Sequence, residues 1–245
     1  AMFLHDYYNY DMIFNCAITA CSAGLGVGYF IKAPKKPKTS TAPISLDRFI
    51  LVKGLRSGLS LMLLGIPYAM TTSYVAIFAK ELNLMGSSAL FFTFLAIGLI
   101  ASRFFSGRQV DKGSLTKMIA FGTMLVAISF CLLGSLKVLL GVNVILASVG
   151  YYISALLIGL SYGTIFPAYN TMFVNLAHHN QRGTASSTYM TSWDVGIGIG
   201  LFLGGHVSQR VGFPSIYILG AFLGLISYVL STKIAAPYFH QHKLR

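Results

Sequence analysis

Apolar residues dominate seven stretches of this chain, and short polar loops separate them. Most of these stretches reach the roughly 20 residues that a helix needs to cross about 30 Å of hydrocarbon. The stretches do not alternate between apolar and polar positions, which argues against an outer-membrane barrel. We therefore predict an all-α, polytopic membrane helix bundle with seven transmembrane helices, since helices satisfy their own backbone groups in lipid. The expected spans are Met12–Ile31, Phe49–Ala79, Ser88–Phe105, Leu115–Leu136, Val144–Leu176, Thr184–His206 and Phe213–Ile234.

The composition excludes an ordinary soluble domain. The 245 residues are 55% hydrophobic and 10% charged, with a mean hydropathy of +0.70, and no soluble core of this size needs so much apolar surface. A net charge of +12 would suggest nucleic acid as a partner of a soluble protein. No basic stripe interleaved with stacking aromatics is present, so we expect the lipid bilayer, and no nucleic acid, as the partner of these cations.

The cations orient the predicted spans. Of the 18 Lys and Arg residues, 15 fall in or beside alternate loops or in the carboxyl-terminal tail, and only Lys80, Lys137 and Arg210 lie on the opposite side. The cation-rich side is expected to be cytoplasmic, which predicts a multi-pass protein of the cytoplasmic (inner) membrane with a cytoplasmic carboxyl terminus. The amino end then begins outside as a short stub, as if cut from something longer. The cysteines and histidines form no metal-ligand pattern, and we expect no metal and no cofactor.

The loop after the third span carries a recognisable pattern. It reads Ser-Arg-Phe-Phe-Ser-Gly-Arg-Gln-Val-Asp-Lys-Gly from Ser102 to Gly113. Glycine permits a tight cytoplasmic turn, and the carboxylate can complement a helix N-terminus or a neighbouring cation. The alternative is a solvated, positive-inside turn. The loop resembles the signature loop of the major facilitator superfamily, and the matching residues are Gly107, Asp111, Lys112, Gly113 and Lys117.

Glycines are concentrated in the sixth span. The run Gly200-Leu-Phe-Leu-Gly204-Gly205 is similar to the Gly-Pro-x-x-Gly-Gly motif of antiporters in the same superfamily, with Leu201 in place of the proline. That motif normally lies in the fifth helix of the family. The alternative explanation is ordinary helix packing, because Gly196, Gly200 and Gly204 at four-residue spacing let helices approach closely.

The resemblance implies an organisation for the whole chain. The first span would be family helix six, and the rest the second half of a transporter, helices seven to twelve. The expected parts are residues 1–31 (stub and first span), 32–56 (basic cytoplasmic connector), 57–237 (six-helix half) and 238–245 (cytoplasmic tail). The implied function is secondary active transport of a small molecule by alternating access, with proton-coupled efflux favoured. The implied partners are the substrate, protons and an amino-terminal transporter half, in the same polypeptide or in a separate chain.

One acidic residue, Asp194, lies deep in a span. Counting from Thr184 at about 1.5 Å per residue places it about 15 Å into the membrane, near the midplane. A charged carboxylate is costly there, so we expect a role in proton coupling or in binding a cationic substrate group. Thr191 and Ser187 share its face, which points away from Gly196, Gly200 and Gly204. A structural Asp bonded to neighbouring hydroxyl groups is the alternative.

Polar and aromatic residues follow one side of the second span and one side of the fifth. In the superfamily the corresponding helices face the central pathway, so the resemblance implies that these residues line a cavity. Such a surface suits a moderately hydrophobic or polyhydroxylic solute better than an anion. Hydrogen bonding between helices is the competing explanation. The candidate lining residues are Tyr68, Thr71, Thr72, Tyr151, Tyr162, Phe166 and Asn170.

Two other functions compete with transport. Gly159-Leu-Ser161-Tyr-Gly163 fits the Gly-x-Ser-x-Gly nucleophile pattern, and His206 could serve as a base in an intramembrane serine protease. That nucleophile needs a strand-turn-helix elbow, which an apolar helix does not provide, so we predict no enzyme activity. The other alternative is a half-size membrane protein that acts as a scaffold or a subunit without transporting anything.

Overall fold

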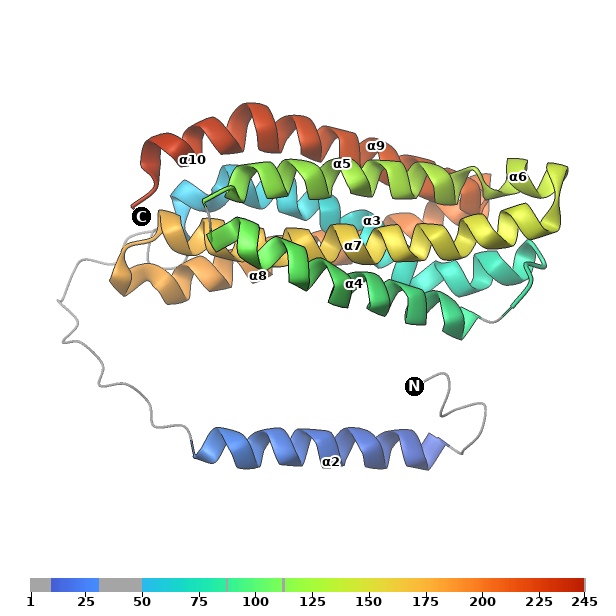
Figure 1. Ribbon diagram of the computed structural model, residues 1–245, viewed down its shortest axis with the longest axis horizontal. Coiled ribbons are helices and arrows are strands. Elements are labelled where there is room, and N and C mark those ends of the chain that lie inside the picture. The colour runs from blue at the N-terminus through green and yellow to red at the C-terminus, as the bar shows by residue number, and fades with distance from the viewer. Residues whose placement is uncertain (1–9, 31–49, 87, 112, 245) are drawn as a thin grey trace. The chain divides into compact units, whose positions relative to one another are not determined.

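The chain folds entirely into helices over the part that the structure describes. This computed structural model describes residues 10–30, 50–86, 88–111 and 113–244, and every regular element in these ranges is helical. The chain divides into two units, residues 1–43 and residues 44–245. The first unit contains α2 (Tyr10–Tyr29), and the second contains a bundle of the remaining helices (Figure 1). The prediction of an all-α helix bundle is confirmed.

Each predicted span contains a helix, and local residues explain several ends. Asn143 caps α7, because its side-chain oxygen accepts a hydrogen bond from the backbone N–H of Ile145 at 2.8 Å. Gly212 has a φ of 95°, which lets the chain reverse between α8 and α9. The bundle helices are α3 (Leu55–Glu81), α4 (Ser88–Asp111), α5 (Leu115–Gly134), α6 (Leu136–Val142), α7 (Val144–Leu176), α8 (Arg182–Val211), α9 (Phe213–Leu230) and α10 (Ala236–His242).

Four helical segments of the described ranges are long and apolar enough to cross a membrane. A fifth apolar segment, Ser88–Phe104, is shorter. The helix α8 has 30 residues but is less apolar, because it carries many Gly, Ser and Thr residues. The four long segments are Val52–Glu81, Leu115–Gly134, Val144–Leu176 and Phe213–His242.

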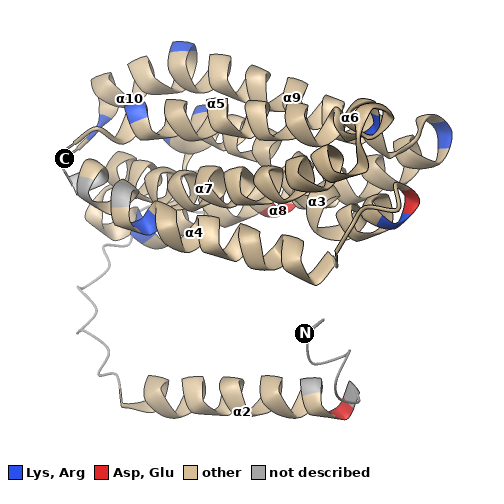
Figure 2. Cartoon of the chain, turned by 45° about the vertical axis from the view of Figure 1, so that its right-hand side comes forward, with Lys and Arg blue, Asp and Glu red and all other residues tan. Residues whose placement is uncertain are grey.

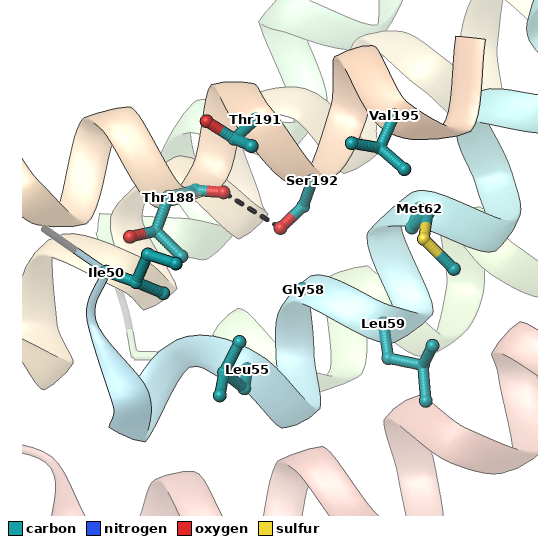
Figure 3. A pocket seen from close by; sticks show the side chains of 9 residues that line it. All are labelled: Ile50, Leu55, Gly58, Leu59, Met62, Thr188, Thr191, Ser192 and Val195. Carbon is teal, nitrogen blue, oxygen red and sulfur yellow. Dashed lines mark hydrogen bonds between the residues drawn. The ribbon is translucent and has the colours of Figure 1, made fainter. Parts of the chain in front are cut away.

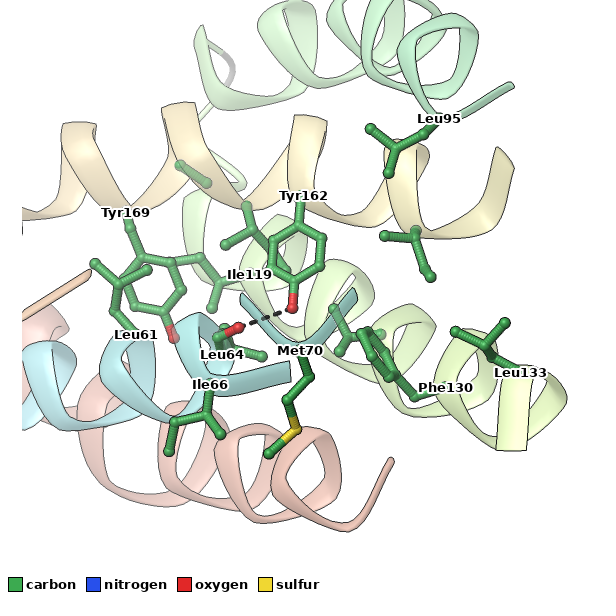
Figure 4. Packing of buried hydrophobic residues seen from close by; sticks show 14 of the residues in the cluster. Leu61, Leu64, Ile66, Met70, Leu95, Ile119, Phe130, Leu133, Tyr162 and Tyr169 are labelled. Carbon is green, nitrogen blue, oxygen red and sulfur yellow. Dashed lines mark hydrogen bonds between the residues drawn. The ribbon is translucent and has the colours of Figure 1, made fainter. Parts of the chain in front are cut away.

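The helices of the bundle pack in pairs around a shared apolar core. The most extensive contacts join α4 to α7 and α3 to α8. The helix α5 packs on α7, the helix α9 packs on α3, and α5 and α9 pack on each other. Large buried side chains from α3, α5 and α7 meet between the pairs, among them Met70, Phe130 and Tyr162 (Figure 4). The helix α7 lies against α4, α5 and α8, so little of its surface is free.

A buried hydroxyl network links three helices. The hydroxyl of Ser60 on α3 lies 2.7 Å from the hydroxyl of Tyr169 on α7 and 2.8 Å from that of Ser227 on α9. The Ser227 hydroxyl also donates to the Ser60 carbonyl at 2.9 Å, and all three side chains are fully buried. Each polar group therefore has a partner away from lipid, which removes the cost of burying it.

The last long helix continues beyond the predicted end of its span at Ile234. A π-helical turn, Ser231–Ala235, joins α9 to α10, and the helix ends only at His242. Proline cannot donate a backbone hydrogen bond and crowds the carbonyl one turn earlier, so Pro237 explains a widened turn just before it. Arg56 of α3 lies over the ring of Tyr238, 4.1 Å from its centroid, and ties α10 to the start of α3.

Candidate functional site

The helices α3 and α8 touch backbone to backbone at glycines. A Cβ atom placed on Gly65 would stand 3.1 Å from the Cα atom of Gly196 and 2.8 Å from the carbonyl oxygen of Trp193. A Cβ on Gly196 or on Gly200 would collide with backbone carbonyls of α3. Gly204 packs on the ring of Tyr74, and Gly196, Gly200 and Gly204 are the buried glycines of α8. Small residues at this crossing fix how α8 presents its other faces.

The opposite face of α8 carries the candidate coupling residues. Ser187, Thr191 and Asp194 are all exposed in the bundle. Asp194 lies about 18 Å along the helix axis from Arg182 and about 26 Å from Val211 by helical rise. Because successive residues advance by about 100°, Asp194 is turned well away from Gly196 two positions later. One helix thus offers a tightly packed face and an open face.

Asp194 has no polar partner within the described part of the chain. None of the described residues forms a hydrogen bond or an ion pair with its carboxylate. A charged carboxylate that faces hydrocarbon is expensive, so an exposed carboxylate on an integral membrane protein favours contact with water, a solute, a proton or another polypeptide. The open face of α8 is therefore the best-founded candidate site on the bundle.

Four aromatic rings from three helices gather beside this face. They are Tyr68 of α3, Tyr162 and Phe166 of α7, and Trp193 of α8, and together we call them the aromatic platform. The ring centroids of Phe166 and Trp193 are 4.8 Å apart at an interplanar angle of 88°, and those of Tyr68 and Trp193 are 5.1 Å apart. Tyr68 and Tyr162 meet edge to face at 4.9 Å. These are favourable aromatic geometries.

The platform is anchored on one side and open on the other. Tyr162 is fully buried, and its hydroxyl donates to the carbonyl of Leu64 at 2.8 Å (Figure 4). Tyr68, Phe166 and Trp193 are each partly exposed. Trp193 was not predicted as a site residue. Its position beside Asp194 and its being the chain's single tryptophan were the available signals.

The structure separates the predicted cavity-lining residues into two groups. Phe166 and Tyr68 are partly exposed, and Thr72 and Asn170 are exposed. Tyr151, Tyr162 and Thr71 are buried in the core. The hydroxyl groups of Tyr151 and Tyr162 bond to carbonyls of α3, which is the helix-to-helix bonding that competed with the cavity interpretation.

The two threonines of the predicted lining bond within their own helix. Thr71 donates to the carbonyl of Pro67 at 3.0 Å, and Thr72 donates to the carbonyls of Tyr68 and Ala69 at 3.2 Å. Proline removes a backbone donor from the helix ladder and loosens the turn before it. These hydroxyl groups are therefore satisfied within α3, and their bonding gives no indication of a solute.

A groove lies between α3 and α8 near the start of both helices. Its volume is about 250 Å³, and its lining is mostly apolar with three hydroxyl groups (Figure 3). Ser192 donates to the carbonyl of Thr188 at 2.8 Å, so part of this polarity is satisfied within α8. The lining residues are Ile50, Leu55, Gly58, Leu59, Met62, Thr188, Thr191, Ser192 and Val195.

The predicted signature loop is helical as far as Asp111, where α4 ends, and α5 begins at Leu115. Gly107 lies within α4 and is exposed, Asp111 is the last residue of that helix, and Lys117 is exposed near the start of α5. Gly113 has a φ of 78°, a conformation that glycine adopts without strain. Lys112 and the side chain of Asp111 lie outside the described residues.

Charged residues gather toward the two ends of the bundle, with long uncharged stretches between them (Figure 2). The alternating helix directions put most described cations at one end. That end carries Lys53, Arg56, Arg103, Lys117, Arg182, Lys233 and Lys243, whereas the other carries Lys80, Lys137 and Arg210. The asymmetry within the described ranges has the same sense as the asymmetry of the whole sequence.

The structure does not provide the geometry of a serine hydrolase. Ser161 lies in the middle of α7 and is fully buried, and its hydroxyl donates to the carbonyls of Leu157 and Ile158 at 2.9 Å. His206 is exposed on α8, where its ring stacks on Phe202 at 6.2 Å. A nucleophile elbow requires a sharp turn after a strand, and a continuous helix stands in its place.

Comparisons with known proteins agree with the architecture. The family model described as Major Facilitator Superfamily matches residues 1–200 and 138–243. A staphylopine export protein of Staphylococcus aureus is 23% identical over 177 residues, which cover 72% of this chain and 43% of that protein. An uncharacterised MFS-type transporter of Burkholderia mallei is 27% identical over 140 residues, which cover 57% of this chain and 33% of that protein.

The matched region is thus less than half the length of either relative. The family model nevertheless spans nearly all of this chain, including every helix of the bundle. Its apolar helices and its family place it among integral membrane proteins. The chain belongs to the major facilitator superfamily.

Proposed function

We propose that this chain is the carboxyl-terminal part of a secondary active transporter that exports a small molecule across the cytoplasmic membrane by alternating access, in exchange for protons. The exposed, unpartnered carboxylate of Asp194 near the middle of α8 carries the proposal. A relative whose name specifies export supports the direction. The carboxyl terminus lies in the cytoplasm under this proposal, because the cation-rich end then follows the positive-inside rule.

Asp194 would exchange a proton for substrate. A carboxylate in a low-dielectric site is more favourable when it is neutral or beside a cation, so protonation and binding of a cationic group compete for the same position. Thr191 and Ser187 lie one and two turns away on the same face and can donate hydrogen bonds to the substrate. Proton entry from one side would then release a substrate bound from the other.

Alternating access requires a second body against which the bundle can move. We assign that role to an amino-terminal transporter half that covers the open face of α8, in the same polypeptide or in a separate chain. The loop from Gly107 to Lys117 would latch the cytoplasmic side in one state. An immunoblot of membranes with a tag on the carboxyl end tests the arrangement: a band at roughly twice the mass of this chain is expected, and a separate half requires co-purification of a second subunit.

The test of coupling replaces Asp194 in the complete transporter. With Asp194→Asn reconstituted in vesicles, substrate-driven proton flux should fall to background, because the amide can neither take up nor release a proton. Glu81→Gln is the matched control, since Glu81 is an exposed carboxylate at the end of α3 and should leave coupling intact. Unchanged flux in Asp194→Asn would remove the assignment.

A further inference from the structure

The exposed rings of the aromatic platform lie at one depth in the membrane. By helical rise, Tyr68 is about 20 Å along α3 from its start and Trp193 about 17 Å along α8 from its start. Phe166 is about 15 Å from the end of α7, which lies on the same side of the bundle. Three helices thus bring aromatic surface to the level of Asp194. Rings that served only to fill the core would be expected to be fully buried, but these three rings are partly exposed.

Two polar groups on the platform have no partner. Neither the hydroxyl of Tyr68 nor the indole N–H of Trp193 forms a hydrogen bond with any described residue. Several other tyrosine hydroxyls of the bundle have partners, and that of Tyr74, for example, donates to the Leu201 carbonyl at 2.9 Å, whereas the buried hydroxyl of Tyr217 has none among the described residues. Unpaired polar groups at membrane depth are costly, so a bound solute or water is expected to contact them.

One carboxylate directly adjoins the platform. Asp194 directly follows Trp193, so their Cα atoms are about 3.8 Å apart. Most Lys and Arg residues of the described ranges lie near the helix ends, but Arg103 is about 12 Å from the end of α4, close to the level of Phe166, and it interacts electrostatically with Tyr189. Aromatic faces carry a negative quadrupole that attracts cations, and tryptophan attracts them most strongly. The ring surface and the carboxylate therefore favour the same kind of ligand.

We propose that the aromatic platform with Asp194 is the binding site for a lipophilic organic cation. The aromatic or alkyl part of this ligand would lie on Trp193, Phe166 and Tyr68, while its positive centre would face the carboxylate. The inference rests on the proposed function and narrows it, because it specifies the chemical class of the exported substrate.

The experiment uses two ions of nearly equal size and shape but opposite charge. Trp193 is the only tryptophan of the chain, so its fluorescence reports directly on the platform. The purified protein in detergent micelles is titrated with tetraphenylphosphonium and, separately, with tetraphenylborate. The cation should quench Trp193 saturably, with a dissociation constant at least tenfold lower than that of the anion. Equal affinity for both ions, or no saturable quenching by the cation, would overturn the inference.

Variants separate a binding site from nonspecific partition into micelles. Phe166→Ala and Tyr68→Ala should each weaken binding of the cation at least fivefold. Phe94→Ala is the matched control, because Phe94 is an exposed ring on α4 that contacts Tyr152, away from the platform. Circular dichroism verifies that each variant keeps its helix content. Equal weakening by all three substitutions, or no weakening by any, would contradict the assignment.

Equilibrium binding needs no proton gradient, so this test is independent of transport. Saturable cation binding together with absent proton-coupled flux would retain the site and reject the proposed transporter. Coupled flux of another substrate, without cation binding, would retain the transporter and reject the aromatic platform as the site. Asp194→Asn adds a third readout: it should weaken binding of tetraphenylphosphonium and lessen the preference over tetraphenylborate.

Discussion

Two helix crossings of this bundle use the same packing device but differ in what they display. At the α3–α8 crossing Gly65 meets Gly196, and at the α4–α7 crossing Gly98 meets Gly159. A Cβ atom on Gly65 would stand 3.1 Å from the facing Cα atom, and a Cβ atom on Gly98 would stand 3.0 Å from its own. The backbones therefore approach equally closely.

The surroundings of the two crossings are different. Trp193 and Asp194 lie one turn or less from Gly196, whereas leucines, including Leu95 and Leu156, surround the contact of Gly98 with Gly159. The α4–α7 crossing holds helices together, and no carboxylate lies within one turn of its glycines. The α3–α8 crossing also fixes the positions of a carboxylate and of the tryptophan ring. Close packing is thus common to both crossings, and the carboxylate and the tryptophan distinguish the α3–α8 crossing.

Substitution of the crossing glycines should have the largest effect. Gly196→Ala and Gly159→Ala each push a methyl group into a facing backbone carbonyl, so each should lower the free energy of unfolding by about 1–3 kcal/mol. Unfolding with sodium dodecyl sulfate in mixed micelles, followed by circular dichroism, measures this loss.

The same pair also tests the difference between the crossings. Only Gly196→Ala should shift the emission maximum of Trp193, because the Trp193 carbonyl lies at that contact. A shift of equal size in Gly159→Ala would show that the surroundings of Trp193 do not depend specifically on the α3–α8 crossing.

Removing the link between α7 and α3 should have a smaller effect. Tyr162→Phe deletes a buried hydrogen bond of 2.8 Å to the Leu64 carbonyl, at a cost of about 1 kcal/mol. Tyr151→Phe is the matched change, since its bond to the Val75 carbonyl is long, at 3.5 Å, and should contribute less. Thermal unfolding of both variants measures the two losses of stability. Equal losses would mean that the donor–acceptor distance does not determine the free-energy cost of removing the hydrogen bond.

The open face of α8 should tolerate change in the absence of substrate. Ser187→Ala alters an exposed residue on the face opposite the glycines, so the free energy of unfolding should stay within about 0.5 kcal/mol of the parent. Chemical unfolding of the purified bundle measures this. A loss as large as that of Gly196→Ala would indicate that the face makes intramolecular contacts.

Hydropathy predicted the helices well because membrane helices are long and the residues at their ends are recognisable in the sequence. Gly212 and Asn143 stand at chain reversals that the pattern already separated. Helical projection also placed Asp194 and Gly196 on different faces. The constant rotation per residue in a helix sets this angle, whichever helices pack against it. The extension of the last helix to His242 was not predicted, because a π-helical turn absorbs Pro237 where an ordinary helix would have ended.

The contacts of α7 could not be read from its pattern. Three helices pack against it, so tyrosines on several sides become buried, and no apolar stripe reveals which of them stays exposed. The partner of Tyr162 is a backbone carbonyl of α3, 98 positions away in the sequence. Trp193 becomes informative only after its ring is seen against Tyr68 and Phe166.

The hydroxyl network of Ser60, Tyr169 and Ser227 bears on how the bundle can move. Sliding one of these helices past the others by a single turn would break several buried hydrogen bonds together and leave their donors without water. Such a slide has a steep free-energy barrier, whereas a rotation of the whole bundle leaves the network untouched. The network thus holds α3, α7 and α9 together as one stiff unit, and bending is confined to the proline turns of α3 and α7.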